Sequence, residues 1–161
     1  MKLIKVLILA VAFILPIAAH AEIDGDDQVA YTQALRDGDV KTVQKYLDAG
    51  LSPNEQFFTW TAIQIAANKG QLEVVKLLLE KGADINYKHP ITMMTSFHLA
   101  AFENHPEVVK YLASKGADIN IKMRGDVSII RALRDAGNTK MVDLLLSLGV
   151  KDDGCKEEKC F

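Results

Sequence analysis

Histidines and carboxylates are the residues whose chemistry could support catalysis in this chain, and their spacing matches no catalytic motif. His89, His98 and His105 follow the N-terminal apolar run, and none has a Cys, Ser or carboxylate partner at the spacing of a known nucleophile–base pair. Asp84 and Asp118 both stand in Gly-Ala-Asp-Ile-Asn, which indicates turn chemistry rather than an acid/base pair. Because Gly-rich phosphate loops and His-x-x-x-His or Cys-x-x-Cys metal signatures are also missing, the sequence predicts no enzyme activity, no cofactor and no metal.

The two cysteines, Cys155 and Cys160, are the second place where chemistry is possible, and both lie near the C-terminus. In an oxidising compartment we expect such a pair to form a disulfide. The short loop that it closes would stabilise the fold by roughly 2 kcal/mol at most. Free or intermolecular thiols and a redox or metal-binding role are the alternatives, although Cys-Lys-Glu-Glu-Lys-Cys supplies too few ligands for a metal site.

The elements that position these residues are copies of one repeated unit. Residues 61–86 and 95–120 align without a gap, so that Thr61 corresponds to Thr95, and both segments end on Gly-Ala-Asp-Ile-Asn. A repeat period of roughly 20 to 50 residues indicates a solenoid, a propeller or another array. Weaker copies flank this pair, and the glycines that close the four copies recur at nearly regular intervals, namely Gly50, Gly82, Gly116 and Gly149.

The repeated unit resembles the ankyrin repeat, which is a hairpin loop followed by two antiparallel helices with the signature Thr-Pro-Leu-His-x-Ala. The run from Thr95 to Ala100 matches that signature except at Ser96 and Phe97, and the run from Thr61 matches more loosely. The resemblance implies that His98 ties loops together by hydrogen bonds. We expect His105, between the two helices of its repeat, to be a solvated cap.

The resemblance covers roughly residues 27–150 and implies an all-α solenoid of about four helix-turn-helix repeats with hairpin loops. The terminal repeats are expected to act as caps, because their charged residues replace apolar positions of the inner copies. The expected organisation is a signal peptide at 1–21, an ankyrin-repeat domain at 22–150 with repeats at about 27–56, 57–90, 91–123 and 124–150, and a tail at 151–161.

The hairpin loops are the predicted binding site, because hairpin tips in ankyrin proteins project toward partners. The three loops differ in length, which suggests tips shaped for one target, and they carry the aromatic, Met and Arg residues that are enriched at interface centres. The candidates are Phe57, Phe58, Trp60, Tyr87, His89, Met93, Met94, Met123 and Arg124 in the loops, with Phe102, Arg131 and Arg134 on the concave helices. Packing beneath the hairpins as local core is the alternative, mainly for Phe58 and Trp60 and to a lesser degree for Tyr87, Met93 and Met123.

The N-terminal segment is expected to be a cleaved signal peptide. Lys2 and Lys5 introduce an apolar run, and Ala19-His20-Ala21 offers small residues at both positions that signal peptidase reads. The run is shorter than the roughly 20 residues that a spanning helix needs, which disfavours an uncleaved membrane anchor. Cleavage after Ala21 would leave 17 basic and 21 acidic residues, a balance that offers nothing to a phosphate backbone.

Together these features predict a non-enzymatic protein-binding module, periplasmic or secreted, that is monomeric when free and binds neither nucleic acid nor, after cleavage, a membrane. The Lys-led leader indicates a bacterial source, with a eukaryotic secreted origin as the alternative. The resemblance to small exported bacterial ankyrin proteins implies an immunity-type inhibitor of a toxin or secreted enzyme, or a protector of a periplasmic enzyme linked to oxidative-stress defence. A redox or metal-binding protein built on Cys155 and Cys160 is the alternative of a different class.

Overall fold

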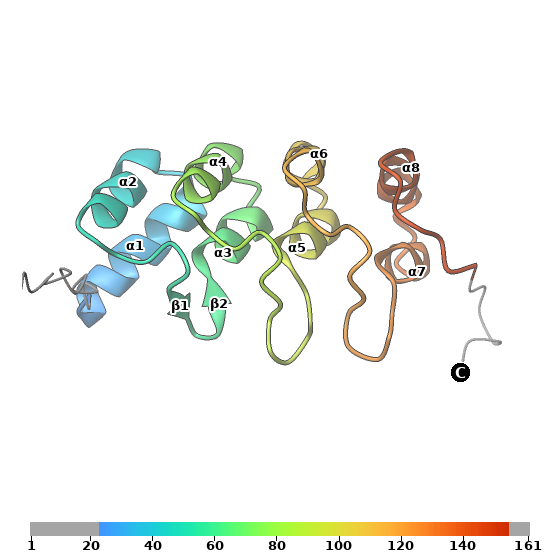
Figure 1. Ribbon diagram of the computed structural model, residues 1–161, viewed down its shortest axis with the longest axis horizontal. Helices are drawn as coiled ribbons and strands as arrows, with labels where there is room; N and C mark the ends of the chain where they lie inside the picture. Colours follow the sequence, from blue (N-terminus) through green and yellow to red (C-terminus); the bar gives the residue numbers. More distant parts are fainter. Residues whose placement is uncertain (1–22, 155–161) are drawn as a thin grey trace, which may run out of the picture.

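Eight helices in four antiparallel pairs make up residues 23–154, the part of the chain that the computed structural model describes. The inner row holds the first helix of each pair: α1 (Gly25–Asp37), α3 (Ala62–Asn68), α5 (Ser96–Phe102) and α7 (Ile129–Asp135). The outer row holds the second: α2 (Val40–Asp48), α4 (Leu72–Glu80), α6 (Pro106–Ser114) and α8 (Thr139–Ser147). Figure 1 shows the pairs stacked along one axis, with the loops between them projecting beyond the inner row. The expected all-α solenoid is confirmed.

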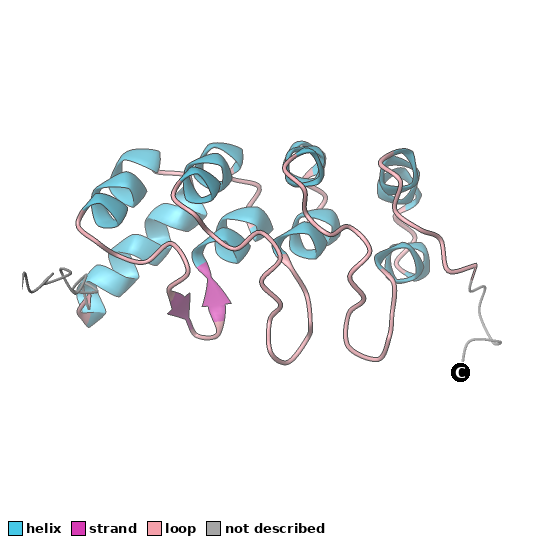
Figure 2. Cartoon of the chain, in the orientation of Figure 1, coloured by secondary structure: helices cyan, strands magenta, loops and turns pink. Residues whose placement is uncertain are grey.

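Three projecting loops connect the successive helix pairs, and the first of them is a β-hairpin. Strands β1 (Gln56–Phe57) and β2 (Trp60–Thr61) are antiparallel, with Phe57 opposite Trp60 (Figure 2). The second loop is closed by the His89 N–H, which donates to the Met94 carbonyl at 2.9 Å. The third is closed by the Met123 N–H, which donates to the Val127 carbonyl at 2.9 Å.

Helix starts follow from side chains that accept the otherwise unpaired N–H groups of the first turn. Asp39 accepts from the Thr42 N–H at 3.1 Å, and Ser128 accepts from the Arg131 N–H at 3.2 Å. At the start of α6, Pro106 occupies the first helical turn, where its missing N–H costs nothing. Local sequence therefore determines where these helices begin.

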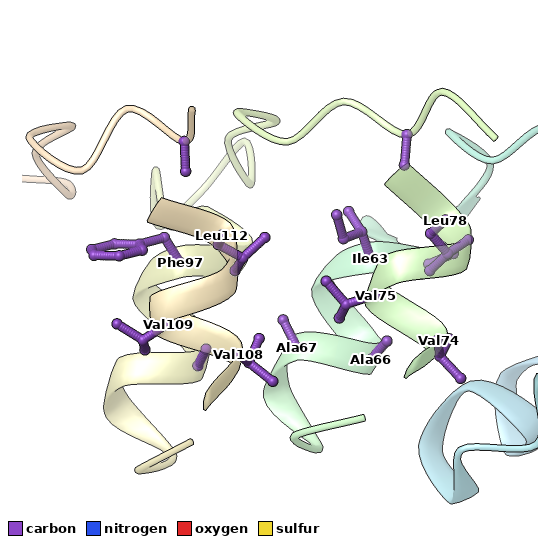
Figure 3. Packing of buried hydrophobic residues seen from close by; sticks show 14 of the residues in the cluster. Ile63, Ala66, Ala67, Val74, Val75, Leu78, Phe97, Val108, Val109 and Leu112 are labelled. Carbon is purple, nitrogen blue, oxygen red and sulfur yellow. The ribbon is translucent and has the colours of Figure 1, made fainter. Parts of the chain in front are cut away.

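The core runs the length of the solenoid between the two rows of helices. Small side chains on α3, such as Ala66 and Ala67, are fully buried and let neighbouring helices approach closely. Branched side chains from α4 and α6 fill the space above them (Figure 3). The labelled set contains Ile63, Val74, Val75, Leu78, Phe97, Val108, Val109 and Leu112, each at most 1% exposed. Because every repeat shares its core with its neighbours, no single repeat can bury its apolar face alone.

A ladder of asparagines joins the turns that follow the outer helices, where each loop begins. The side-chain carbonyl of Asn54 accepts from the Asp84 N–H at 2.7 Å, and Asn86 accepts from the Asp118 N–H at 2.8 Å. Asn120 continues the ladder by accepting from the Lys151 N–H at 2.8 Å. These equivalent residues fix the register of each repeat on the next.

Helices α7 and α8 approach α5 and α6 less closely than the earlier pairs approach one another. The fully buried ring of Phe97 points away from α3 and α4, toward this wider junction (Figure 3). None of the helices within residues 23–154 is both long and apolar enough to cross a membrane.

Candidate functional site

A groove lies where the first hairpin meets the inner helices α1 and α3. Its volume is about 350 Å³, near the lower end of the roughly 300–1,000 Å³ typical of ligand pockets. The hairpin and α3 supply the apolar lining, and both helices supply polar and basic side chains. The lining residues are Thr32, Arg36, Phe57, Phe58, Trp60, Gln64, Ile65, Asn68 and Lys69.

Phe58 forms the tip of the first hairpin and the exposed wall of the groove. Its side chain is 93% exposed, the highest value among the large apolar residues described. Phe58 and Thr59 both have positive φ angles, +51° and +73°, which suit the right-handed twist of the two-residue hairpin. A positive φ is unfavourable for a β-branched residue such as Thr59. The hairpin conformation that exposes the Phe58 ring therefore has a cost in conformational free energy.

Trp60, on β2, packs against His89 from the second loop, with ring centroids 4.5 Å apart. His89 is only 4% exposed, which makes it a structural residue rather than the partner-binding residue expected from sequence. Its Nδ1 accepts from the N–H groups of Ile91 and Thr92, both at 3.3 Å. The ring proton is therefore on Nε2, which donates to Thr59 Oγ1 at 2.8 Å. His89 holds the first two loops together.

Phe57, which was expected from the sequence to bind a partner, is a core residue instead. It is 5% exposed, and its ring packs on Tyr31 with centroids 5.4 Å apart. Tyr31 in turn packs edge-on against Tyr46, also at 5.4 Å. Alternation along β1 explains the assignment, because successive side chains of a strand point to opposite sides and Gln56 is the exposed one.

Four of the other loop candidates, Tyr87, Met93, Met94 and Met123, are half-buried. Met93 adopts a φ of +61° in the second loop, and the Met94 carbonyl accepts from Gln64 Nε2 at 2.9 Å. Arg124 is exposed at the third loop, where its N–H donates to the Thr92 carbonyl at 2.9 Å and ties the second and third loops together. Among these five candidates, Arg124 is exposed and the other four are partly covered.

The three helical candidates lie farther along the inner row. Phe102, at the end of α5, is half-buried and packs against the core. Arg134 forms a bidentate pair with Asp152, at 2.8 and 3.3 Å, which raises the pKa of its guanidinium. Arg131 lies 3.9 Å from Asp135. The two arginines are thus engaged within the C-terminal repeat, and neither lines the groove.

His98 ties adjacent loops together, as its place in the signature implies. Its Nδ1 accepts from the Thr95 N–H at 3.1 Å, and Nε2 donates to the Ile121 carbonyl at 3.0 Å. Burial lowers the pKa of His98 to about 4, so the ring is neutral at pH 7. Gln64 occupies the same position one repeat earlier and donates to the second loop.

His105 is a half-buried link between repeats, not the solvated cap expected from sequence. It precedes α6, but its side chain makes no cap hydrogen bond. Its Nε2 donates instead to the Asn68 carbonyl at the end of α3, at 3.0 Å. The repeat-equivalent Gln71 donates to the Arg36 carbonyl at 2.6 Å. These links between successive repeats satisfy carbonyls that would otherwise be unpaired at helix ends.

Sequence reasoning missed several exposed residues on this face. Ile91, beside Pro90 in the second loop, is 59% exposed. The exposed Arg36 and Lys69 and the half-buried Ile65 were also missed, although each follows or interrupts a run of buried residues on α1 or α3, a periodic signal that could have revealed them.

Candidate metal ligands and unpartnered buried polar groups are the remaining features of the described residues that bear on chemistry. Within 23–154 no group of three or more His, Cys, Asp or Glu side chains is arranged to hold a metal ion. The buried Tyr31 hydroxyl lacks a hydrogen-bond partner among the described residues, and burial raises its pKa well above the usual range. Cys155 and Cys160 lie outside the described residues, as does the expected signal peptide.

Comparison with known proteins gives the class to which this arrangement belongs. A family model for ankyrin repeats, in three copies, matches residues 31–123, more than half of the chain. The chain therefore belongs to the ankyrin-repeat family, whose members are protein–protein interaction modules.

Curated relatives share only the repeats. The ankyrin repeat, SAM and basic leucine zipper domain-containing protein 1 of Atelerix albiventris is 38% identical over 58 residues, which is 35% of this chain and 12% of that protein. The protein of the same name from Ovis aries is 33% identical over 61 residues, 37% of this chain and 13% of that protein. The matches therefore span only about an eighth of these relatives.

Proposed function

We propose that this chain is an exported, non-enzymatic binding protein that holds one partner protein against its hairpin tips and inner helices. The observation that carries the proposal is the exposure of Phe58 and Ile91 at the tips of consecutive loops, 93% and 59% respectively. Soluble proteins rarely keep large apolar side chains together on a surface that has no partner. His89 clamps the two loops, so that these tips are held in a fixed arrangement before binding, which lowers the entropic cost of association.

The compartment that we propose is the periplasm, or the secreted fraction, and it rests on the charged, apolar and small-residue pattern of the leader. Intact mass of the protein recovered from its native host tests it. A chain that begins at Glu22 supports export with cleavage, whereas a mass that retains residues 1–21 contradicts it.

The role proposed for the module is inhibition or protection of the partner, which would be a toxin, a secreted enzyme or a periplasmic enzyme. Either role requires a stable complex of defined stoichiometry. The test is capture from periplasmic extract, purification of the captured protein, and an enzyme assay with and without this chain. A fall in the partner's activity indicates inhibition, and slower inactivation by peroxide or heat indicates protection.

The face that binds is tested on the same purified partner by calorimetric titration. Phe58→Ala with Ile91→Ala should weaken binding by roughly 2–4 kcal/mol, because exposed apolar anchors carry much of the energy of an interface. Leu146→Ala is the matched control, since Leu146 is 41% exposed on the outer helix α8, away from the loops (Figure 1). An equal loss of binding in Leu146→Ala and in the double variant Phe58→Ala with Ile91→Ala would contradict the assignment of this face.

A further inference from the structure

The groove between the first hairpin and helices α1 and α3 has a chemical character that its apolar lining does not explain. Its only charged lining residues are Arg36 and Lys69, and both are cations. Neither forms an ion pair with any carboxylate in the described part of the chain. A cleft lined by charges of one sign concentrates the opposite charge from solution.

Both cations stand at the ends of inner helices, Arg36 in the last turn of α1 and Lys69 just after α3. A positive charge is stabilised there by the partial negative charge of the helix C-terminus. The cations are therefore compatible with the fold without a carboxylate partner of their own, which leaves them available to a ligand. The neighbouring Asp37 forms no ion pair with Arg36 in the described part of the chain, and its carboxylate accepts from Gln33 Nε2 at 2.8 Å.

The apolar part of the groove comes from Phe58, Trp60 and Ile65, on the hairpin and α3. Val29 extends this surface, since it lies one helical turn before Thr32 on the same face of α1 and is 68% exposed. A volume of about 350 Å³ suits one or two side chains rather than a large cofactor.

We propose that this groove accepts a large apolar side chain from an acidic segment of the partner, whose carboxylates pair with Arg36 and Lys69. The inference rests on the proposed function and narrows it, because it assigns both the chemistry of the partner segment and the place where it binds. The charges set the encounter rate and the specificity, and the apolar anchor excludes water from the contact.

Trp60 is the only tryptophan in the chain, so its fluorescence reports occupancy of the groove directly. The probes are three capped hexapeptides without tryptophan: Asp-Glu-Phe-Leu-Glu-Asp, its basic counterpart Lys-Lys-Phe-Leu-Lys-Lys, and its apolar-deficient counterpart Asp-Glu-Ala-Ala-Glu-Asp. They are titrated against the protein as recovered from its host, at low and high salt. The first peptide should shift the emission in a saturable manner, at least tenfold more tightly than either counterpart, and high salt should weaken it.

The matched variants separate the groove from overall charge. Arg36→Glu with Lys69→Glu should reduce binding of the acidic peptide by tenfold or more. Lys41→Glu with Lys140→Glu makes the same change in net charge on exposed positions of the outer helices α2 and α8, and should leave binding within twofold. Circular dichroism and urea midpoints check that all variants are folded.

Equal binding of the acidic and basic peptides, or no saturable change with any of the three, would overturn the inference. A concentration-dependent dimer that protects Trp60 would also overturn it, because the groove would then hold a second copy of the chain. These failures differ from failure of the proposed function. Normal capture of the partner by Arg36→Glu with Lys69→Glu, together with loss of capture by Phe58→Ala with Ile91→Ala, would support the proposed binding face. It would contradict only the pairing of partner carboxylates with Arg36 and Lys69 in the groove.

Discussion

The imidazole of His105 lies directly over Gly70, so close that a Cβ at position 70 would be 2.5 Å from Nδ1. From this position His105 reaches the Asn68 carbonyl at 3.0 Å and fastens the third repeat to the second. Gly70 also has a φ of +72°, which side chains other than glycine adopt at a cost. One glycine therefore serves both the left-handed turn and the close approach between repeats.

We expect Gly70→Ala to lower the free energy of unfolding by about 2–3 kcal/mol. About 1 kcal/mol comes from the left-handed conformation, and the rest from displacement of His105 and loss of its hydrogen bond. Gly137→Ala is the control, because Gly137 has the same φ of +72° and a Cβ there would have no neighbour within 4 Å. Its cost should be about 1 kcal/mol. Urea denaturation measures both, and equal costs would contradict the steric role of His105.

Acidification should destabilise the fold through His98. Its pKa is about 4 in the folded protein and 6.5 in a model peptide, so the unfolded chain binds the proton more readily. The free energy of unfolding is unaffected by His98 protonation above pH 6.5. It decreases by up to about 3 kcal/mol as the pH falls toward 4, because the unfolded chain takes up the proton first. The measurement is the urea midpoint at pH 7.5 and pH 4.5, compared between wild type and His98→Gln.

The His98→Gln variant retains a hydrogen-bonding side chain that does not titrate, as Gln64 does at the equivalent position one repeat earlier. The other acid-labile groups are common to both proteins, so the variant should lose less stability on acidification than wild type. Parallel pH profiles would show that His98 does not contribute to the pH dependence.

Replacing His89 should disturb structure rather than remove a binding contact. His89→Ala deletes the acceptor for the Ile91 and Thr92 N–H groups and the stacking partner of Trp60. We expect a loss of about 1–3 kcal/mol in stability and a red shift of Trp60 emission as the indole becomes solvated. Lys88→Ala, at the neighbouring position, should change stability by less than about 0.5 kcal/mol. An unchanged Trp60 spectrum in His89→Ala would argue against the clamp.

Neighbouring leucines on α4 should differ in their contribution to stability. Leu78 is fully buried, whereas Leu79 is only partly buried. Leu78→Ala should cost about 3–5 kcal/mol, because it leaves a cavity between helices, and Leu79→Ala about 1–2 kcal/mol. Thermal and urea unfolding of both variants provide the comparison. A larger effect at Leu79 would mean that Leu79, not Leu78, faces the core between the two rows of helices.

The third and fourth repeats meet differently from the others, and a single residue accounts for part of the difference. Asn104 stands where the two preceding repeats have Gly38 and Gly70, and it adopts a φ of +59° despite its side chain. In the following repeat, Asn138 stands at the position of Gln71 and His105. Its side chain does not bond to the preceding repeat but accepts from the Met141 N–H of its own helix at 3.2 Å. Among the described repeats, the link made by Gln71 and His105 is missing where the glycine is replaced.

Sequence alone determined the repeat and its helices, whereas the role of His98 was implied by the resemblance to ankyrin repeats. These features are local or periodic: apolar residues at helical spacing, a Thr at the start of each inner helix of the central repeats, and a Gly at the end of each outer helix. A repeat period transmits such local information along the chain, because each unit packs only on its neighbours.

Only the tertiary structure decided which loop residues are exposed. Phe57 and His89 stand in the loops and were therefore expected to bind a partner. In the structure Phe57 is covered by Tyr31 of α1, and His89 by Trp60 of the first hairpin. The groove likewise exists only because α1, the first hairpin and α3 meet, which brings Arg36 and Lys69 to one opening. Loop side chains lack the periodicity that encodes burial in a helix, so their exposure depends on distant residues that only folding brings together.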